Sequence, residues 1–409
     1  MAPEGWRRSP LGEVAHIVMG QSPPGDAYNS AGEGEPLLNG PTEFGVVHPT
    51  PIQWTTTPTK FAETGDVLFC VRGSTTGRQN VSDRRYCIGR GLAAIRGLRD
   101  LSHTPFLRHV LAELAEAVLM EARGSGSTFP NITSDRLTAQ LVALPSLPEQ
   151  RKIAAILSSV DEAIEGTQAV IDQLQVVKKA MMADLLTRGI PGRHKKFKQT
   201  EIGEVPEDWE VVPMGTVATI GNGSTPSKAR PDYWDGGTIP WLPTGKVNDY
   251  IIRTADSFVT EKALAECPIR LLPRGTVLVA MIGQGKTRGM VAYLDVEATI
   301  NQNFAYVAPG AAVRSWFLFA FLNHVYGELR GSGRGSNQDA LNCGILKAFP
   351  VPVPQVDEQE MIARGCFALD ERIIREADAV SGLLELKSAL MSVLLTGEVR
   401  VRVDEESAA

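Results

Sequence analysis

The chain carries one long helical pattern twice, and this duplication constrains its fold more than any other feature. KKAMMADLLTRG at 178–189 returns as KSALMSVLLTGE at 387–398, 209 positions later. The pair EQ at 149–150 returns at 358–359 with the same spacing. A repeat of about 200 residues is far longer than a solenoid unit, so it indicates two copies of a whole domain.

Each copy ends in a segment with heptad spacing. Apolar residues alternate at steps of four and three, which predicts a coiled-coil helix of roughly forty residues and about 60 Å. The expected helix seam consists of Ile153, Leu157, Val160, Ile164, Ile171, Leu174, Lys178 and Leu185, and of Ile362, Leu369, Ile373, Val380, Leu383, Lys387, Leu390 and Leu394. The two lysines interrupt the apolar seam at matched positions. There they either fix the register of the helices or extend their charge to water. The spacing alone leaves parallel and antiparallel pairing open.

The segment before each helix is rich in glycine, proline and β-formers, which favours a β-rich domain. Strands are expected at 67–71, 92–95, 276–282 and 304–307, and helices at 105–122 and 314–330. The predicted fold class is therefore α+β. The predicted domains are 1–147, helix 148–190, linker 191–207, second domain 208–355, helix 356–398 and polar tail 399–409.

Cysteine usage and hydropathy indicate in which cellular compartment the protein is expected. The five cysteines are scattered without a C-x-x-C pair, which argues against a disulfide framework and a zinc site. No apolar run reaches about 18 residues, and the N-terminus has no apolar signal core. We therefore expect a cytoplasmic protein.

Charge is distributed unevenly. The formal net charge is −6, but residues 72–99 contain seven arginines and one acid, Asp83. A local basic patch binds phosphates more directly than a net charge does. The alternative is a solvated strand face.

Motifs for catalysis are missing. AMIGQGKT at 280–287 has Ala280 where a phosphate-binding loop needs glycine. QSPPGD at 21–26 has Ser22 and Gly25 where the amine-gripping loop of amino-methyltransferases needs an acidic or amide residue and an aromatic one. The six histidines show no ligand spacing, so no metal or cofactor is expected on this chain.

Polar loops recur in both copies after matching strands. Arginine reads guanine and glutamine or asparagine reads adenine, while lysine and backbone amides hold phosphate. The candidate DNA-contacting residues are Arg72, Ser74, Thr75, Thr76, Arg78, Gln79, Asn80 and Asn131 in the first copy, and Gln284, Lys286, Thr287, Arg288, Asn301, Gln302, Asn303, Asn337 and Gln338 in the second. For any one residue, a hydrogen-bonded turn is an equally good interpretation.

These motifs together resemble a known family. LPSLPEQRKIAAILSSVDEAIE at 144–165, VPVPQVDEQEMIA at 351–363 and the two helix tails are similar to the conserved regions of specificity (S) subunits of type I restriction–modification systems. The GDVL, INQNF and GSG segments resemble parts of the same family's target recognition domains. The resemblance covers essentially the whole chain.

The resemblance implies two target recognition domains in a pseudo-two-fold arrangement, separated by two long antiparallel coiled-coil helices. Each domain would read half of a bipartite, asymmetric site in double-stranded DNA. The chain itself would be non-catalytic and would join two methyltransferase (M) subunits and restriction (R) subunits, which would use S-adenosylmethionine, ATP and Mg. Two alternatives stay open: a partner with fused nuclease and methyltransferase, and a coiled-coil scaffold without a role in DNA binding.

Overall fold

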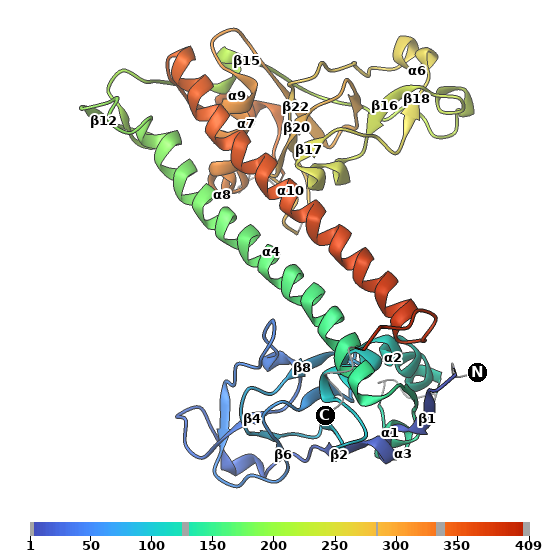
Figure 1. Cartoon of the computed structure of the whole chain (residues 1–409). Helices are drawn as coiled ribbons and strands as arrows, with labels where there is room; N and C mark the ends of the chain where they lie inside the picture. The colour runs from blue at the N-terminus through green and yellow to red at the C-terminus, as the bar shows by residue number, and fades with distance from the viewer. Residues whose placement is uncertain (1–3, 125–130, 284, 333–339, 404–409) are drawn as a thin grey trace. The chain divides into compact units, whose positions relative to one another are not determined.

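The structure is a computed structural model that describes residues 4–124, 131–283, 285–332 and 340–403. Its contacts divide the chain into two units (Figure 1). Unit 1 comprises Met1–Ala169 and Glu376–Ala409, and unit 2 comprises Val170–Arg375. The predicted domain boundaries gave each long helix a segment of its own, whereas the contacts divide each helix between the units.

Unit 1 contains two sheets. An antiparallel sheet has the order β2-β10-β7-β8, and a second sheet has the order β3-β5-β4-β9-β6. Their bounds are β2 Ala15–Met19, β10 Leu92–Gly97, β7 Val67–Cys70, β8 Gln79–Val81, β3 Tyr28–Asn29, β5 Gln53–Thr55, β4 Glu35–Leu38, β9 Tyr86–Ile88 and β6 Phe61–Ala62. Helix α2 (Thr104–Gly124) packs on β7 and β10, where Phe69, Phe106 and Leu107 are fully buried.

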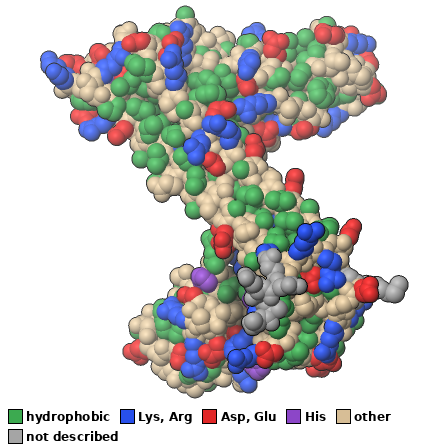
Figure 2. Space-filling view, viewed as in Figure 1, with side chains coloured by type: hydrophobic (Ala, Val, Ile, Leu, Met, Phe, Trp, Pro, Cys, Tyr) green, Lys and Arg blue, Asp and Glu red, His purple; other side chains and the backbone are tan. Residues whose placement is uncertain are grey.

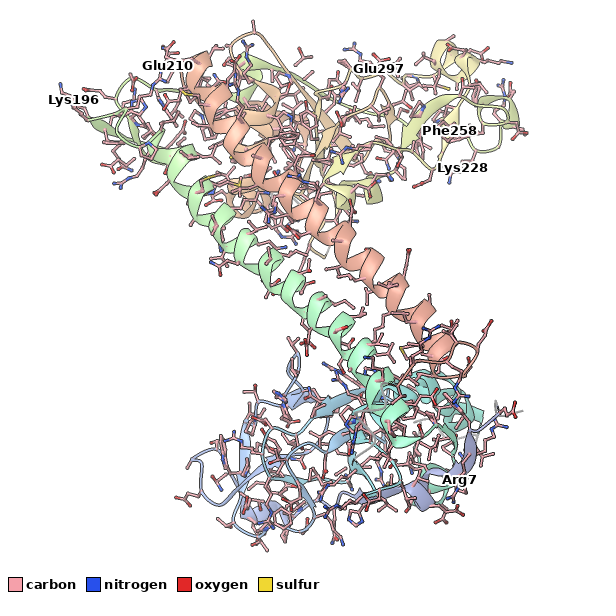
Figure 3. The ribbon with its side chains drawn as sticks, viewed as in Figure 1. Arg7, Lys196, Glu210, Lys228, Phe258 and Glu297 are labelled. Atoms are coloured by element: carbon pink, nitrogen blue, oxygen red, sulfur yellow. The ribbon has the colours of Figure 1, made fainter. Side chains whose placement is uncertain are left out.

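Unit 2 repeats this plan. One sheet has the order β15-β22-β19-β20-β17, and a smaller one has the order β18-β16-β21. Their bounds are β15 Ala218–Asn222, β22 Phe304–Pro309, β19 Val277–Ala280, β20 Val291–Leu294, β17 Ile251–Ile252, β18 Phe258–Val259, β16 Ile239–Leu242 and β21 Thr299–Ile300. Figure 3 shows Lys228 and Phe258 on the lobe that contains β16 and β18.

Short elements complete each unit. Strand β1 (Arg7–Pro10) pairs with β11 (Leu141–Leu144), as β14 (Glu210–Pro213) pairs with β23 (Pro350–Val353). The remaining elements are α1 Leu11–Val14, α3 Ser134–Thr138, β12 Phe197–Thr200, β13 Gly203–Pro206, α5 Met214–Val217, α6 Glu261–Glu266, α9 Cys343–Ala348 and the 3-10 turns η1 Gly25–Ala27, η2 Pro41–Glu43, η3 Pro231–Tyr233 and η4 Thr244–Asp249.

The helix predicted in the second domain is divided into two helices in the structure. The sequence predicted one helix at 314–330, but α7 (Ser315–His324) and α8 (Tyr326–Gly331) are separated at Val325. Valine and the nearby Gly327 are poor helix formers, which explains the break. The four predicted strand segments correspond to β7, β10, β19 and β22.

The two long helices are α4 (Leu147–Arg188) and α10 (Val356–Leu394). Within each unit the first half of one helix contacts the second half of the other, so they run antiparallel there. Each helix tail is followed by a glycine in the left-handed conformation, Gly189 at φ 74° and Gly397 at φ 73°. Glycine adopts this conformation without a Cβ clash, so it suits the turn that follows each helix. The predicted α+β fold with a duplicated domain and long helices is confirmed.

Candidate nucleic-acid interface

Three polar segments of unit 1 meet where β7 ends. The Val71 N–H donates to Gly91 O at 2.9 Å, and the Ile132 N–H donates to Val71 O at 2.9 Å. Arg72 and Asn131 form an isolated β-bridge. The segments 72–78, 89–91 and 131–132, which are distant in sequence, therefore share one edge of the domain.

Unit 2 builds the same edge with equivalent bonds. The Met281 N–H donates to Asn303 O at 2.9 Å, and the Leu341 N–H donates to Met281 O at 3.0 Å. The loop after β19 and the INQNF segment at 300–304 therefore lie together. We call these two regions the strand-end edges: residues 72–78, 89–91 and 131 in unit 1, and 282–283, 285–288 and 301–303 in unit 2.

Five of the eight residues predicted in unit 1 expose their side chains at this edge: Arg72, Ser74, Thr75, Arg78 and Asn131. Thr76 and Asn80 do not. The Thr76 hydroxyl donates to Gly73 O at 2.7 Å, and the Asn80 amide donates to Gly45 O at 2.9 Å. These two buried side chains hold the loop in shape, so their assignment as DNA contacts is corrected.

The remaining unit 1 candidate, Gln79, faces inward. Its amide nitrogen and oxygen are buried, and neither has a hydrogen-bond partner among the described atoms. Gln79 lines a cavity of about 220 Å³ together with His109 of α2, Asp161 of α4 and Lys387 of α10. It therefore lies behind the edge, on the side of the long helices.

The candidate residues of unit 2 also fall into exposed and buried ones. Lys286 and Gln302 are exposed, and Thr287 and Asn303 are half-buried. Arg288 and Asn301 are buried. Asn301 Oδ1 accepts hydrogen bonds from Thr244 Oγ1 at 3.0 Å and from the Asn303 N–H at 3.1 Å, so its role is to shape the turn. The predicted Gln284, Asn337 and Gln338 lie outside the described residues.

The arginine patch is smaller than its sequence suggests. Arg96 forms a bidentate pair with Asp66 at 2.6 and 3.0 Å. Arg85 lies 3.6 Å from Glu63 and stacks 3.6 Å from the Phe61 ring centroid. In the described part of the chain, Arg72, Arg90 and Arg99 have no carboxylate within ion-pair distance. In the face seen in Figure 2, basic and acidic side chains are interspersed.

Arg90 is absent from the residues predicted to contact DNA, yet it is exposed at the unit 1 edge. The sequence shows it only as one of seven nearby arginines. Its position between Gly89 and Gly91 becomes informative once the hydrogen-bond register aligns it with the INQNF segment. A close comparison of IGRGL at 88–92 with INQNF at 300–304 could have revealed it.

The helix seam residues are all buried or half-buried. Lys178 pairs with Asp370, and Lys387 pairs with Asp161 at 2.5 Å. Their side chains are 16% and 24% exposed, so each lysine bonds to the opposite helix and does not extend to water. The interpretation in which the lysines extend their charge to water is therefore not supported, whereas contacts between the helices are what a role in fixing the register requires.

The glutamine of the repeated EQ pair connects the start of each long helix to its domain through hydrogen bonds. Gln150 donates to Leu101 O and Pro145 O and accepts from the His103 N–H. Gln359 donates to Ala312 O and Pro354 O and accepts from the Arg314 N–H. Both glutamines are fully buried. A buried amide with all these bonds made is costly to replace.

Neither unit shows a metal centre or a membrane segment in its described part. No group of three or more His, Cys, Asp or Glu side chains there is placed to hold a metal ion. No described helix is long and apolar enough to cross a bilayer.

Comparison with known proteins identifies the class. The family model described as type I restriction modification DNA specificity domain matches residues 3–176 and 206–379. The chain therefore belongs to this family, and the predicted resemblance is confirmed. The two matches coincide with the duplication.

Among curated relatives, the type I restriction enzyme MjaVIII specificity subunit of Methanocaldococcus jannaschii is 29% identical over 291 residues, covering 69% of this chain and 68% of that protein. The MjaIX specificity subunit of the same organism is 33% identical over 183 residues, covering 44% and 41%. A further relative, 37% identical over 187 residues, is covered over 43% of its length. The chain thus aligns with less than half of two of these relatives.

Solved structures share the fold. The crystal structure of a type I restriction–modification S subunit from M. genitalium has a TM-score of 0.64 at 16% identity, covering 95% of this chain and 96% of that one. A chain from a structural study of complex assembly in the type I R-M system has a TM-score of 0.56 at 18% identity, covering 98% and 100%.

Proposed function

We propose that this chain is the DNA-recognition subunit of a type I restriction–modification enzyme. Each unit would read one half of a bipartite, asymmetric site in double-stranded DNA through its strand-end edge. The observation that carries this proposal is the repetition of the edge: both units place exposed polar side chains on the same hydrogen-bonded framework. Recognition of two different half-sites needs two similar surfaces with different side chains.

The catalytic steps would belong to partner subunits. Two methyltransferase subunits would supply S-adenosylmethionine-dependent methylation of adenine, and restriction subunits would use ATP and Mg. The outer faces of α4 and α10 support such assembly, because Val176, Val177, Leu384 and Leu386 are 65%, 44%, 51% and 47% exposed. Exposed apolar side chains grouped on long helices favour contact with other proteins. Figure 2 shows hydrophobic side chains reaching the surface of the molecule.

The test is co-expression with the methyltransferase subunit, followed by mapping of methylated adenines in the host genome. We expect a motif with two specified parts and a non-specific spacer. Incubation of the chain alone with DNA and a labelled methyl donor is the control, and methyl transfer there would contradict a non-catalytic role. A methylated motif without two separate parts would contradict bipartite recognition.

The long helices would set the spacer between the half-sites. One heptad corresponds to about 10.5 Å of helix, which is close to three base-pair steps. Removing 164–170 together with 373–379 keeps the heptad phase of both helices, so we expect a methylated motif with both half-sequences and a shorter spacer. An unchanged spacer would contradict this role of the helices.

A further inference from the structure

The turn that contains Arg90 in unit 1 is built by the same hydrogen bonds as the turn that contains Gln302 in unit 2. The Gly89 N–H donates to Leu38 O at 2.8 Å, and the Asn301 N–H donates to Leu242 O at 3.1 Å. These bonds follow β4 and its counterpart β16. The residues after Gly89 and Asn301 therefore occupy equivalent positions.

Two further pairs of bonds confirm this alignment. The Gln21 N–H donates to Ile88 O and the Ser224 N–H donates to Ile300 O, both at 3.0 Å. The Leu92 N–H donates to Gly89 O at 3.0 Å, and the Phe304 N–H donates to Asn301 O at 3.3 Å. The bonds on both sides of the turn thus agree, with no insertion between them. Arg90 and Gln302 are the central residues of the same turn.

A hydroxyl residue accompanies each central residue. Ser22 Oγ accepts a hydrogen bond from the Arg90 N–H at 3.3 Å. Thr225 Oγ1, at the matching position, donates to the side-chain oxygen of Gln302. The Gln302 amide nitrogen remains available to donate, and the Arg90 guanidinium has no acidic partner in the described part of the chain.

The backbone of both turns is fixed by close contacts. A Cβ atom on Gly89 would lie 2.5 Å from Asn39 Oδ1, and one on Gly91 would lie 2.5 Å from Asn39 O. In unit 2 the buried Asn301 holds the turn through Thr244. The central side chains are exposed while the backbone beneath them is constrained, which is the arrangement that precise recognition requires.

The chemistry of the two side chains points to bases more than to phosphates. Arginine and glutamine can both contact phosphate, but phosphate contacts carry no sequence information and give no reason for different side chains at one matched position. Arginine bonds bidentately to guanine O6 and N7, and glutamine bonds bidentately to adenine N6 and N7. The difference between the units is therefore the difference expected of two half-sites with different bases.

We propose that Arg90 and Gln302 are equivalent specificity-determining residues, Arg90 reading a guanine in one half-site and Gln302 an adenine in the other. This inference rests on the proposed function. It adds a residue that the loop pattern did not indicate, and it assigns the two units different bases at one matched position.

The test exchanges the two side chains in the full chain, co-expressed with its methyltransferase subunit. Arg90→Gln is expected to change one guanine of one half-site to adenine and to leave the other half-site unchanged. Gln302→Arg is expected to make the reverse change in the other half-site only. Discrimination between the two bases at that position should shift by about 5- to 150-fold in purified complexes. The unaltered half-site reports that the variant is folded.

Arg99→Gln is the matched control. Arg99 is also exposed and lacks an acidic partner, but it follows the other end of β10 (Leu92–Gly97), about 20 Å of strand away from Arg90. It should leave the motif unchanged. An unchanged motif in Arg90→Gln, with affinity lowered equally for all sequences and a salt slope reduced by about one, would show a phosphate contact and overturn the proposal. An unchanged motif with unchanged affinity would also overturn it. If the wild-type chain gives no bipartite motif, the proposed function fails first.

Discussion

The two units contain the same interhelical ion pair, but their recognition domains enclose it differently. In unit 2 the pair of Lys178 and Asp370 is covered by Tyr250, whose hydroxyl accepts from Lys178 at 2.8 Å and donates to Asp370 at 3.3 Å. In unit 1 the pair of Lys387 and Asp161 borders an open cavity of about 220 Å³. The repeated helices thus supply the ion pair in both units, and the domain packed beside each pair determines whether a further side chain covers it.

This difference changes the electrostatics. Burial raises the pKa of Asp370, against the lowering effect of Lys178, and burial likewise raises the pKa of the Tyr250 hydroxyl. In unit 1 the neighbouring titratable group is His109, whose Nδ1 lies 4.0 Å from Asp161 Oδ2. Burial lowers the pKa of His109 to about 4. One unit therefore covers its ion pair with a tyrosine hydroxyl, and the other places a neutral histidine beside it.

The largest expected effect comes from removing the lysine of the sealed pair. Lys178→Met leaves the buried Asp370 without its cation, which should lower the free energy of unfolding of unit 2 by about 3–5 kcal/mol. Lys387→Met should cost unit 1 only about 1–3 kcal/mol, because water can reach Asp161 through the cavity. Hydrogen exchange of the slowest amides in β19 and β22, compared with β7 and β10, measures each unit separately.

The double variant Lys178→Met/Asp370→Leu serves as the control for this comparison. A buried pair replaced by apolar residues of similar volume is often neutral for stability, so the double variant should recover most of the loss. Equal losses of unfolding free energy for Lys178→Met and Lys387→Met would mean that the cavity does not lower the cost of leaving Asp161 without its lysine.

The second effect is a pH dependence of unit 1 that comes from His109. His109 has an ordinary pKa of 6.5 when unfolded and about 4 when folded, because burial outweighs the raising effect of Asp161. The unfolded chain therefore binds the proton first as the pH falls. Stability from the neutral histidine is complete above pH 6.5 and is lost between pH 6.5 and 4, by about 3 kcal/mol in total.

The measurement is the free energy of opening of β7 and β10 by hydrogen exchange at pH 7.5 and 5.5. His109→Gln should flatten the slope in unit 1. This control matters because burial also lowers the pKa values of His103 in unit 1 and His324 in unit 2. A slope that survives in His109→Gln would assign it to another group.

The third effect concerns the buried glutamate at each helix start. Glu149 of α4 is held by Arg400, with bonds of 2.6 and 2.8 Å, and the exposed fraction of its side chain is 3%. Glu358 of α10 has Arg193 nearby, but it also contacts the Ile190 N–H, His194 Nε2 and Trp209 Nε1. Arg400→Ala should therefore destabilise unit 1 more than Arg193→Ala destabilises unit 2.

Thermal and chemical unfolding of the two variants, read by the same slow amides, checks this difference. Glu149→Gln combined with Arg400→Ala removes the buried charge and should recover part of the loss. A larger effect for Arg193→Ala than for Arg400→Ala would contradict the expectation that the additional contacts of Glu358 compensate for the loss of Arg193. The predicted polar tail at 399–409 thus contains Arg400, a residue with a structural role in unit 1.

The seam and the duplication could be predicted because heptad spacing and repeated motifs are local sequence properties. The partners of Lys178 and Lys387 could not, although Asp161 and Asp370 recur at the same spacing. Their pairing depends on antiparallel register, which the spacing leaves open. Loop residues were harder still: Thr76, Asn80 and Asn301 have the chemistry of DNA contacts, but burial makes them supports of their own turns. Arg90 could have been found by comparing IGRGL at 88–92 with INQNF at 300–304, an alignment that the hydrogen-bond register supports.

The smallest effect isolates the hydroxyl that seals the unit 2 pair. Tyr250 has φ 62°, an unusual conformation for a residue other than glycine, and its ring packs 4.8 Å from Phe319. Tyr250→Phe keeps the ring and loses two hydrogen bonds, while Lys178 still pairs with Asp370. We expect a loss of about 1 kcal/mol in unit 2 and none in unit 1, measured by the slow amides of β19 and β22. Tyr250→Gly, which relieves the backbone but removes the ring, is the matched variant and should cost more. Because both variants lose the hydroxyl, a larger effect of Tyr250→Phe would mean that relief of the backbone at Tyr250 outweighs the loss of its aromatic contact.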